Sequence, residues 1–328
     1  MDEDAVMMDL AHGGAIAMPG EARPFDVVSS DGLRLSAQSW GDRSRPAIVF
    51  IHGFAQAHLC WLRQTRGKLA RSFHLVTYDL RGHGGSDKPS DLSRYDKPRL
   101  WADDLAAVMD GAQVPRAVLV AWSFGGRCAF DYLAEYGSDR IAGLNLVGAG
   151  VSDRPGLRGT GSAALRPLMR SADLSKNIAG KREFLRRCFF RQPDERSFEE
   201  MLAYNMITPP EVRGMMLARS GQPEAVIGRM RLPVLVTFGI KDALASLDGA
   251  RFAASLLPNA ELSLYEEVGH APFHEAPERF NAELRSFADR AFANRAFANR
   301  AFANRAFASS PPTGAGIIEK EDCHDRKA

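Results

Sequence analysis

The sequence predicts an α/β protein in which a mainly parallel central sheet is covered by helices on both faces. Short runs rich in apolar and β-branched residues alternate with longer runs that carry apolar residues at three- and four-residue spacing. Several of the short runs are apolar throughout, which is typical of strands buried on both faces of a parallel sheet. A long stretch without a strand signal, residues 151–230, interrupts this alternation.

Most of the expected strands are bounded by Gly, Pro or Asp. The expected strands are 33–40, 46–53, 73–80, 117–123, 141–149, 233–239 and 261–269. The alternating runs joined by SSDG at 29–32 fit an antiparallel hairpin at the edge of the sheet. Between the strands, 99–112 and 125–137 are expected to form amphipathic helices.

These elements predict one core with an insertion and two extensions. The expected core comprises 23–150 and 231–290, with an Arg-rich helical cap at 151–230 inserted between the two parts and a flexible leader at 1–22. The tail, 291–328, repeats a five-residue unit that places its phenylalanines on no single helix face. We expect an extension of the last core helix that runs into disorder, with partner binding as the alternative.

The composition of the chain argues against several classes of function. The 42 basic and 40 acidic residues give a net charge of +2, so the sequence offers no basic field for nucleic acid. The first residues lack a basic n-region and a long apolar stretch, so we expect no signal peptide, no membrane association and a cytoplasmic protein. Cys60, Cys128, Cys188 and Cys323 are scattered without a CxxC motif, which argues against a zinc site or a disulfide framework. We expect no metal and no cofactor, and the oligomeric state does not follow from the sequence.

Three residues at predicted strand ends could carry chemistry. In VLVAWSFGGRCAF (118–130), an apolar strand runs into Ser123 and continues as a helix, and a sharp turn there would expose the hydroxyl. A serine nucleophile needs a base and a third group that orients the base. His270 follows the last expected strand and Asp242 follows the strand before it. Because carboxyl ends of parallel strands share one edge of a sheet, we expect the three side chains to converge.

Other residues have competing interpretations. Asp248 and Asp153 are alternatives to Asp242 as the acid, and Cys128 could be a second nucleophile but is favoured as a buried hydrophobe. His274 suggests a metal pair with His270, but no HExxH motif surrounds them, and a turn residue near a helix start is the favoured interpretation. A basic cluster in the cap could attract an anionic substrate, but a solvated helix face is the favoured interpretation; its members are Lys181, Arg182, Arg186 and Arg187.

Five motifs in order carry a resemblance to the α/β-hydrolase family from about residue 25 to 290. They are HGF (52–54), YDLRGHGGSDKP (78–89), AWSFGG (121–126), FGIKD (238–242) and GHAPFHEAPERF (269–280). Within the family the chain looks most like cofactor-free haloperoxidases, esterases and lactonases. The resemblance implies Ser123 as nucleophile, Asp242 as acid, His270 as base, and an oxyanion hole from the backbone N–H groups of Phe54 and Phe124. One departure is Ala121, where the family motif GxSxG begins with glycine.

The expected function is hydrolysis of a small-molecule carboxylic ester or lactone through an acyl-enzyme, with perhydrolysis as a possible side activity. Serine at position 123 separates the chain from dehalogenases and epoxide hydrolases of this fold, in which aspartate is expected there. A carbon–carbon bond hydrolase and a non-catalytic ligand-binding receptor stay open as alternatives. An apolar substrate pocket is expected from Trp61, Trp122, Tyr204 and Met206, with packing of the cap as the competing interpretation.

Overall fold

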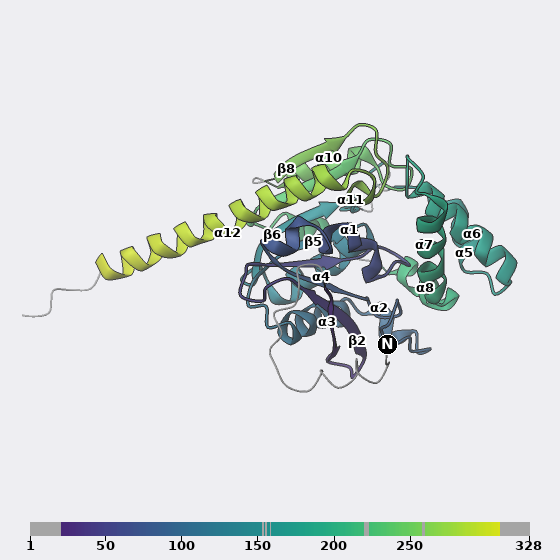
Figure 1. Cartoon of the computed structure of the whole chain (residues 1–328), viewed down its shortest axis with the longest axis horizontal. Helices are drawn as coiled ribbons and strands as arrows, with labels where there is room; N and C mark the ends of the chain where they lie inside the picture. Colours follow the sequence, from purple (N-terminus) through teal and green to yellow (C-terminus); the bar gives the residue numbers. More distant parts are fainter. Residues whose placement is uncertain are drawn as a thin grey trace, which may run out of the picture. The chain divides into compact units, whose positions relative to one another are not determined.

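A mixed sheet organises the described part of the chain in the computed structural model, which covers residues 21–308 apart from 153, 155, 158, 220–222 and 258–259 (Figure 1). Within these residues the sheet has eight strands in the order β1-β2-β4-β3-β5-β6-β7-β8. The strands are β1 (Arg23–Val28), β2 (Arg34–Trp40), β3 (Ala47–Ile51), β4 (His74–Tyr78), β5 (Ala117–Trp122), β6 (Ile141–Val147), β7 (Val234–Gly239) and β8 (Ala260–Tyr265).

Strand direction confirms the expected architecture. β1 and β2 form an antiparallel hairpin, and β2 also runs antiparallel to β4. The other neighbouring pairs, from β4 across to β8, are all parallel. Every residue of β3 to β7 is buried, whereas exposed and less exposed residues alternate in β1, in agreement with an apolar centre and an amphipathic edge.

Helices cover both faces of the sheet. The longer helices of the first half are α3 (Pro98–Gly111) and α4 (Phe124–Tyr136), and the last is α12 (Pro277–Ala308). In β6, Gly143 and Leu146 are three residues apart and therefore point to opposite faces. Gly143 lies against Phe287 of α12, and Leu146 lies against Gly126 of α4. The two helices therefore pack on opposite faces of this strand.

A helical insertion separates β6 from β7. Its helices are α5 (Arg166–Met169), α6 (Leu174–Arg187), α7 (Glu195–Ile207), α8 (Pro210–Ala218) and α9 (Pro223–Ile227). The Asp173 carboxylate caps α6 by accepting from the N–H groups of Ser175 and Lys176, and Asp194 caps α7 in the same way through Ser197. The sequence of the insertion therefore specifies where α6 and α7 begin.

The remaining elements are short. They comprise α1 (Leu62–Thr65), α2 (Ser93–Asp96), α10 (Leu247–Leu256) and α11 (Pro272–Glu275), with 3₁₀ turns η2 (His58–Trp61), η3 (Lys68–Arg71) and η4 (Ala163–Leu165). No helix among the described residues is both long and apolar enough to cross a membrane.

The repeated segment begins inside the packed part of the molecule. The described residues up to Phe292 form one compact unit, and those from Ala293 form a second. Phe287 and Ala291 are buried, and the guanidinium of Arg116 lies 5.7 Å from the ring centre of Phe292. Residues 291–308 belong to α12, while the predictions for 1–20 and for 309–328 fall outside the described residues.

Candidate active site

Ser123 occupies the junction between β5 and α4 in a backbone conformation that few residues adopt. Its φ of 53° and ψ of −112° lie outside the regions favoured by residues with a side chain. Hydrogen bonds on both sides hold the turn: the Ser123 N–H donates to the Val147 carbonyl at 2.9 Å, and the Gly126 N–H donates to the Ser123 carbonyl at 3.0 Å. The turn leaves the serine side chain half-buried at a cavity wall.

Glycine permits the close approach behind this turn. A Cβ on Gly125 would lie 2.5 Å from the carbonyl oxygen of Ile51, a distance that no side chain tolerates. A Cβ on Gly126 would lie 2.7 Å from the Cβ of Ala149. The first turn of α4 can therefore cross the ends of β3 and β6 only because both positions lack side chains.

Asp242 and His270 form a buried pair at the same sheet edge. His270 Nδ1 lies 2.6 Å from Asp242 Oδ2, and the two side chains are 4% and 0% exposed. The other carboxylate oxygen of Asp242 accepts from the N–H groups of Leu244 and Ala245, at 2.7 and 2.9 Å. With a proton on Nδ1 directed at the carboxylate, the imidazole keeps Nε2 as an acceptor.

The backbone of His270 is fixed from two directions. Its N–H donates to the carbonyl of Cys188 at 3.0 Å, and its carbonyl accepts from the indole N–H of Trp122 at 2.9 Å. Glu275 holds the preceding residue, because its carboxylate accepts from the Gly269 N–H at 2.9 Å. The loop after β8 is therefore anchored to the core, the insertion and α11.

Gly148 completes the support of the Asp242–His270 pair, and sequence reasoning missed it. Its φ is +53°, and a Cβ at this position would lie 3.0 Å from His270 Nδ1 and 3.4 Å from Asp242 Oδ2. The available signal was a glycine near the end of the expected strand 141–149, at the edge where the other site residues were expected.

A cavity of about 160 Å³ lies over Ser123 and His270. Phe54 and Phe124 also line it, and among the described residues no acceptor takes a hydrogen bond from either backbone N–H. The cavity brings Ser123, His270 and these two residues together, with Asp242 behind His270. Ser123 Oγ and His270 line the same cavity but make no hydrogen bond with each other in the described structure; catalytic hydrogen bonds often form or shorten only when substrate binds.

The expected apolar pocket residues lie elsewhere. Neither Trp61, Trp122, Tyr204 nor Met206 is among the described residues that line this cavity. Trp61 is fully buried and packs on Phe273 with ring centres 4.3 Å apart, so its position is explained by core packing. The apolar walls come instead from Phe184, Met216 and Leu244, and two arginines, Arg127 and Arg166, also reach the cavity.

The other candidate acids and nucleophiles are not brought to the site. Asp248 lies in the first turn of α10 with its side chain 72% exposed and pairs with Arg251, while Asp153 lies outside the described residues. The Cys128 thiol is buried in α4, and burial raises its pKa. Burial lowers the pKa of His274 to about 4, and the described residues contain no group of three or more side chains suited to a metal ion.

The basic cluster of the insertion is not a uniform solvated face. Arg182 is exposed and Arg187 pairs with Glu183 at 2.9 Å, as expected of a solvated helix. Lys181 is instead buried, and burial together with the nearby Arg213 lowers its pKa to about 7. The expectation of a solvated face is therefore wrong for this residue.

Two buried histidines brace the loop that contains Phe54. His83 Nε2 accepts from the Ala55 N–H at 3.2 Å, and His52 Nε2 accepts from the Leu80 N–H at 3.0 Å. Each Nδ1–H donates to a backbone carbonyl, Arg81 for His83 and Gly53 for His52. Burial lowers their pKa values to about 3 and about 4, so both rings are neutral acceptors at pH 7.

Comparison with known proteins identifies the family of the chain. The sequence matches the alpha/beta hydrolase family over residues 48–283. A putative aryl esterase from Burkholderia cenocepacia is 36% identical, with a TM-score of 0.79 over 83% of this chain and 100% of that one. An esterase from Rhodococcus sp. ECU1013 is 32% identical, with a TM-score of 0.76 over 81% of this chain and 98% of that one.

Another relative of the chain is named for a different activity. The non-heme chloroperoxidase of Streptomyces lividans is 28% identical over 288 residues, which cover 80% of this chain and 98% of that protein. With the matched family covering the greater part of the sequence, the chain belongs to the α/β-hydrolase family and is a hydrolase of the haloperoxidase and esterase type.

Proposed function

We propose that the protein is a serine hydrolase that cleaves a small carboxylic ester or lactone through an acyl-enzyme. The observation that carries the proposal is the placement of three groups: Asp242 is hydrogen-bonded to His270 Nδ1, and His270 shares a cavity wall with Ser123. An isolated serine hydroxyl is a weak nucleophile at neutral pH, and this arrangement supplies the base and the group that orients it.

In the proposed acylation step, Ser123 Oγ attacks the carbonyl carbon while its proton passes to His270 Nε2. Asp242 holds the imidazole in the required tautomer and stabilises the imidazolium that forms. The imidazolium then protonates the leaving alkoxide, and the carbon–oxygen bond of the ester breaks. In deacylation, His270 removes a proton from water, the resulting hydroxide attacks the acyl carbon, and Ser123 leaves with the proton restored.

We assign the oxyanion hole to the backbone N–H groups of Phe54 and Phe124. Both residues line the cavity, and neither N–H has another acceptor in the described structure. Phe124 is also the first residue of α4, so the positive end of that helix dipole faces the developing negative charge. Each such donor contributes on the order of 3 kcal/mol to transition-state stabilisation.

The cavity volume favours a small substrate. About 160 Å³ is below the usual range of roughly 300–1,000 Å³ for pockets of drug-sized ligands. We therefore expect short acyl or alcohol groups to be preferred.

Perhydrolysis is a second candidate activity, in which hydrogen peroxide replaces water in the attack on the acyl-enzyme. The bifunctional esterase/perhydrolase of Acinetobacter calcoaceticus is 36% identical over 123 residues, which cover 38% of this chain. The acyl-enzyme chemistry proposed here needs only a different nucleophile for that reaction.

Hydrolysis of p-nitrophenyl acetate, butyrate and octanoate by the wild type, Ser123→Ala and Ser255→Ala tests the proposal. Ser255 is an exposed serine of α10 that bonds only a carbonyl of its own helix, and it serves as the matched control. We expect Ser123→Ala to lose at least about 10³-fold in kcat/KM and Ser255→Ala to keep it.

Labelling with a fluorophosphonate distinguishes the alternatives. Labelling of the wild type but not of Ser123→Ala is expected for an active serine. Labelling without ester hydrolysis would favour the carbon–carbon hydrolase alternative, and absence of both would favour the ligand-binding receptor.

We also propose a cytoplasmic location. Cys60, Cys128 and Cys188 are free thiols in the described structure. Disulfides are common in oxidising compartments and rare in the cytoplasm, and these reduced cysteines are consistent with the latter. Retention of the tagged protein in the cytoplasmic fraction of its native host is the expected result.

A further inference from the structure

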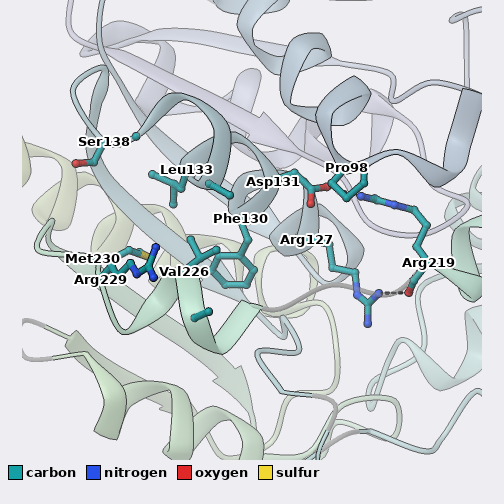
Figure 2. A pocket seen from close by; sticks show the side chains of 13 residues that line it. Pro98, Arg127, Phe130, Asp131, Leu133, Ser138, Arg219, Val226, Arg229 and Met230 are labelled. Atoms are coloured by element: carbon teal, nitrogen blue, oxygen red, sulfur yellow. Dashed lines mark hydrogen bonds and ion pairs between the residues drawn. The ribbon is translucent and has the colours of Figure 1, made fainter.

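A second and larger cavity lies along α4, away from Ser123. Its volume is about 480 Å³, within the range of ligand-binding pockets. Figure 2 shows the side chains that surround it. Within the described structure, Ser123 and His270 do not line this cavity, and the residue that it shares with the active-site cavity is Arg127.

The middle of the cavity is apolar. Phe130 and Leu133 contribute from α4, and Val226 and Met230 contribute from α9 and the residues after it. In Figure 2 Phe130 and Val226 lie between Arg229 on one side and Arg219 on the other. Such a wall suits an alkyl chain, which gains roughly 0.8 kcal/mol for each methylene group that it buries.

The two ends of the cavity differ in how their charged side chains are paired. At one end, Arg219 and Asp131 form an ion pair with 2.6 Å between Nη2 and Oδ2, and the two side chains are 2% and 13% exposed. The Arg219 guanidinium also lies 4.7 Å from the ring centre of Trp101. This pairing neutralises Asp131, which is the one carboxylate among the described lining residues.

The other end is cationic. Arg229 is exposed there, and its guanidinium forms no ion pair with any residue of the described structure. Figure 2 places it at the far side of the cavity from Asp131, next to Met230. An anionic group at this end would meet an arginine and avoid the buried carboxylate, and a guanidinium can bind a carboxylate with two hydrogen bonds.

We propose that the cavity along α4 is a second binding site, for an aliphatic monocarboxylate of medium length, with the carboxylate at Arg229 and the alkyl chain against Phe130, Leu133 and Val226. Charge complementarity selects the head group, and the apolar wall selects the chain. The site is separate from the proposed catalytic one, although a ligand that reaches Arg127 would contact a residue of both cavities.

Isothermal titration of the full-length protein with sodium octanoate tests the proposal without any turnover. We expect saturable binding, weakened about threefold to tenfold in Arg229→Gln. Arg182→Gln is the matched control, since Arg182 is an exposed arginine of α6 outside both cavities, and it should bind like the wild type. 1-Octanol has the same chain without the charge, and its affinity should not differ between Arg229→Gln and the wild type.

Ala134→Trp locates the bound chain. Ala134 is an exposed lining residue of α4, so the larger side chain can be accommodated while it fills part of the cavity. We expect octanoate affinity to fall at least tenfold, with far-UV circular dichroism and Tm showing an intact fold. Wild-type affinity in this variant, no binding to the wild type, or equal weakening in Arg182→Gln and Arg229→Gln would each overturn the proposal. Because no ester is cleaved in these titrations, their failure is distinct from failure of the proposed catalytic function.

Discussion

Gly148 lies directly against the imidazole of His270, so that a methyl group on its α-carbon would be 3.0 Å from Nδ1 and 3.4 Å from Asp242 Oδ2. The substitution Gly148→Ala would crowd the hydrogen bond between these two side chains. We expect kcat for ester hydrolysis to fall about 10- to 100-fold, because small displacements of the proposed catalytic base, His270, would be costly. Steady-state kinetics with p-nitrophenyl butyrate measures the effect.

Gly32→Ala separates crowding from backbone strain. Gly32 also has a positive φ, +79°, but a Cβ there would meet no atom within 4 Å. Both variants should lose about 1 kcal/mol of unfolding free energy from the strained backbone, and only Gly148→Ala should lose activity. Equal activity in the two variants would show that Gly148 does not constrain the pair.

Glu275 joins the insertion to the loop of His270. Its carboxylate accepts from the N–H groups of Gly269, Phe190 and Arg191, at 2.9, 3.1 and 2.8 Å. Glu275→Ala would leave these donors without their acceptor, and we expect a loss of about 2–4 kcal/mol in urea unfolding together with reduced kcat. Glu275→Gln retains a side-chain carbonyl and should lose less of both, whereas equal losses would indicate that the charge rather than the acceptor geometry matters.

Acid pH is expected to destabilise the protein through His52 and His83. Their folded-state pKa values of about 4 and about 3 lie below the ordinary value of 6.5, because burial disfavours the charged ring. The unfolded chain therefore binds more protons between pH 6.5 and 4, and the free energy of unfolding falls as the pH falls through this range. Each histidine contributes up to roughly 2 kcal/mol between pH 7 and pH 5.

His83→Gln tests this contribution. Urea unfolding at pH 7 and pH 5 should show a smaller loss in the variant than in the wild type, by about 1–2 kcal/mol. The same pH dependence in both proteins would exclude His83 as a buried neutral group. Activity should also fall, because the Ala55 N–H loses its ring acceptor next to the proposed oxyanion donor Phe54.

The convergence of Ser123, Asp242 and His270 could be predicted because each follows a strand whose apolar pattern is evident in the sequence. Parallel strands end at one edge, so correct strand assignment also places the residues after them. The cavity walls could not be predicted in this way. Trp122 is adjacent to Ser123 in sequence, yet it does not line the cavity, and its indole N–H donates to the carbonyl of His270 instead.

Residues of the insertion were harder still to assign. Phe184 and Met216 reach the candidate active-site cavity, whereas Tyr204 and Met206 do not line it, although all four are apolar or aromatic residues in helices. Local periodicity gives the apolar face of a helix but not the element that this face will contact. Which of them lines the cavity depends on the packing of the insertion over the sheet.

For the charged residue Lys181, too, burial could not be predicted from the local sequence. Its position leads to a further prediction. Its side chain is buried in the insertion, with Nζ 3.4 Å from the Met206 carbonyl at the end of α7. Arg213 is buried nearby and donates to the carbonyls of Asn205 and Thr208. Unpaired carbonyls at a helix end attract cations, so both residues are drawn into the interior although the sequence alone suggests solvent exposure.

The burial of Lys181 should make the protein more stable at alkaline pH. Its pKa of about 7 in the folded state lies below the ordinary value of 10.5, chiefly through burial and then through Arg213. The unfolded chain therefore binds more protons between pH 7 and 10.5, and this group's contribution to the free energy of unfolding rises with pH over that range. Between pH 7 and pH 9 we expect the free energy of unfolding to gain about 1–2 kcal/mol in the wild type relative to Lys181→Met.

The control variant is Lys176→Met, because Lys176 is an exposed lysine on the same helix, and it should behave like the wild type in urea unfolding at both pH values. A Lys181→Met protein with the wild-type pH dependence would mean that the Lys181 ammonium is solvated, and that the carbonyls at the end of α7 are satisfied by Arg213 alone.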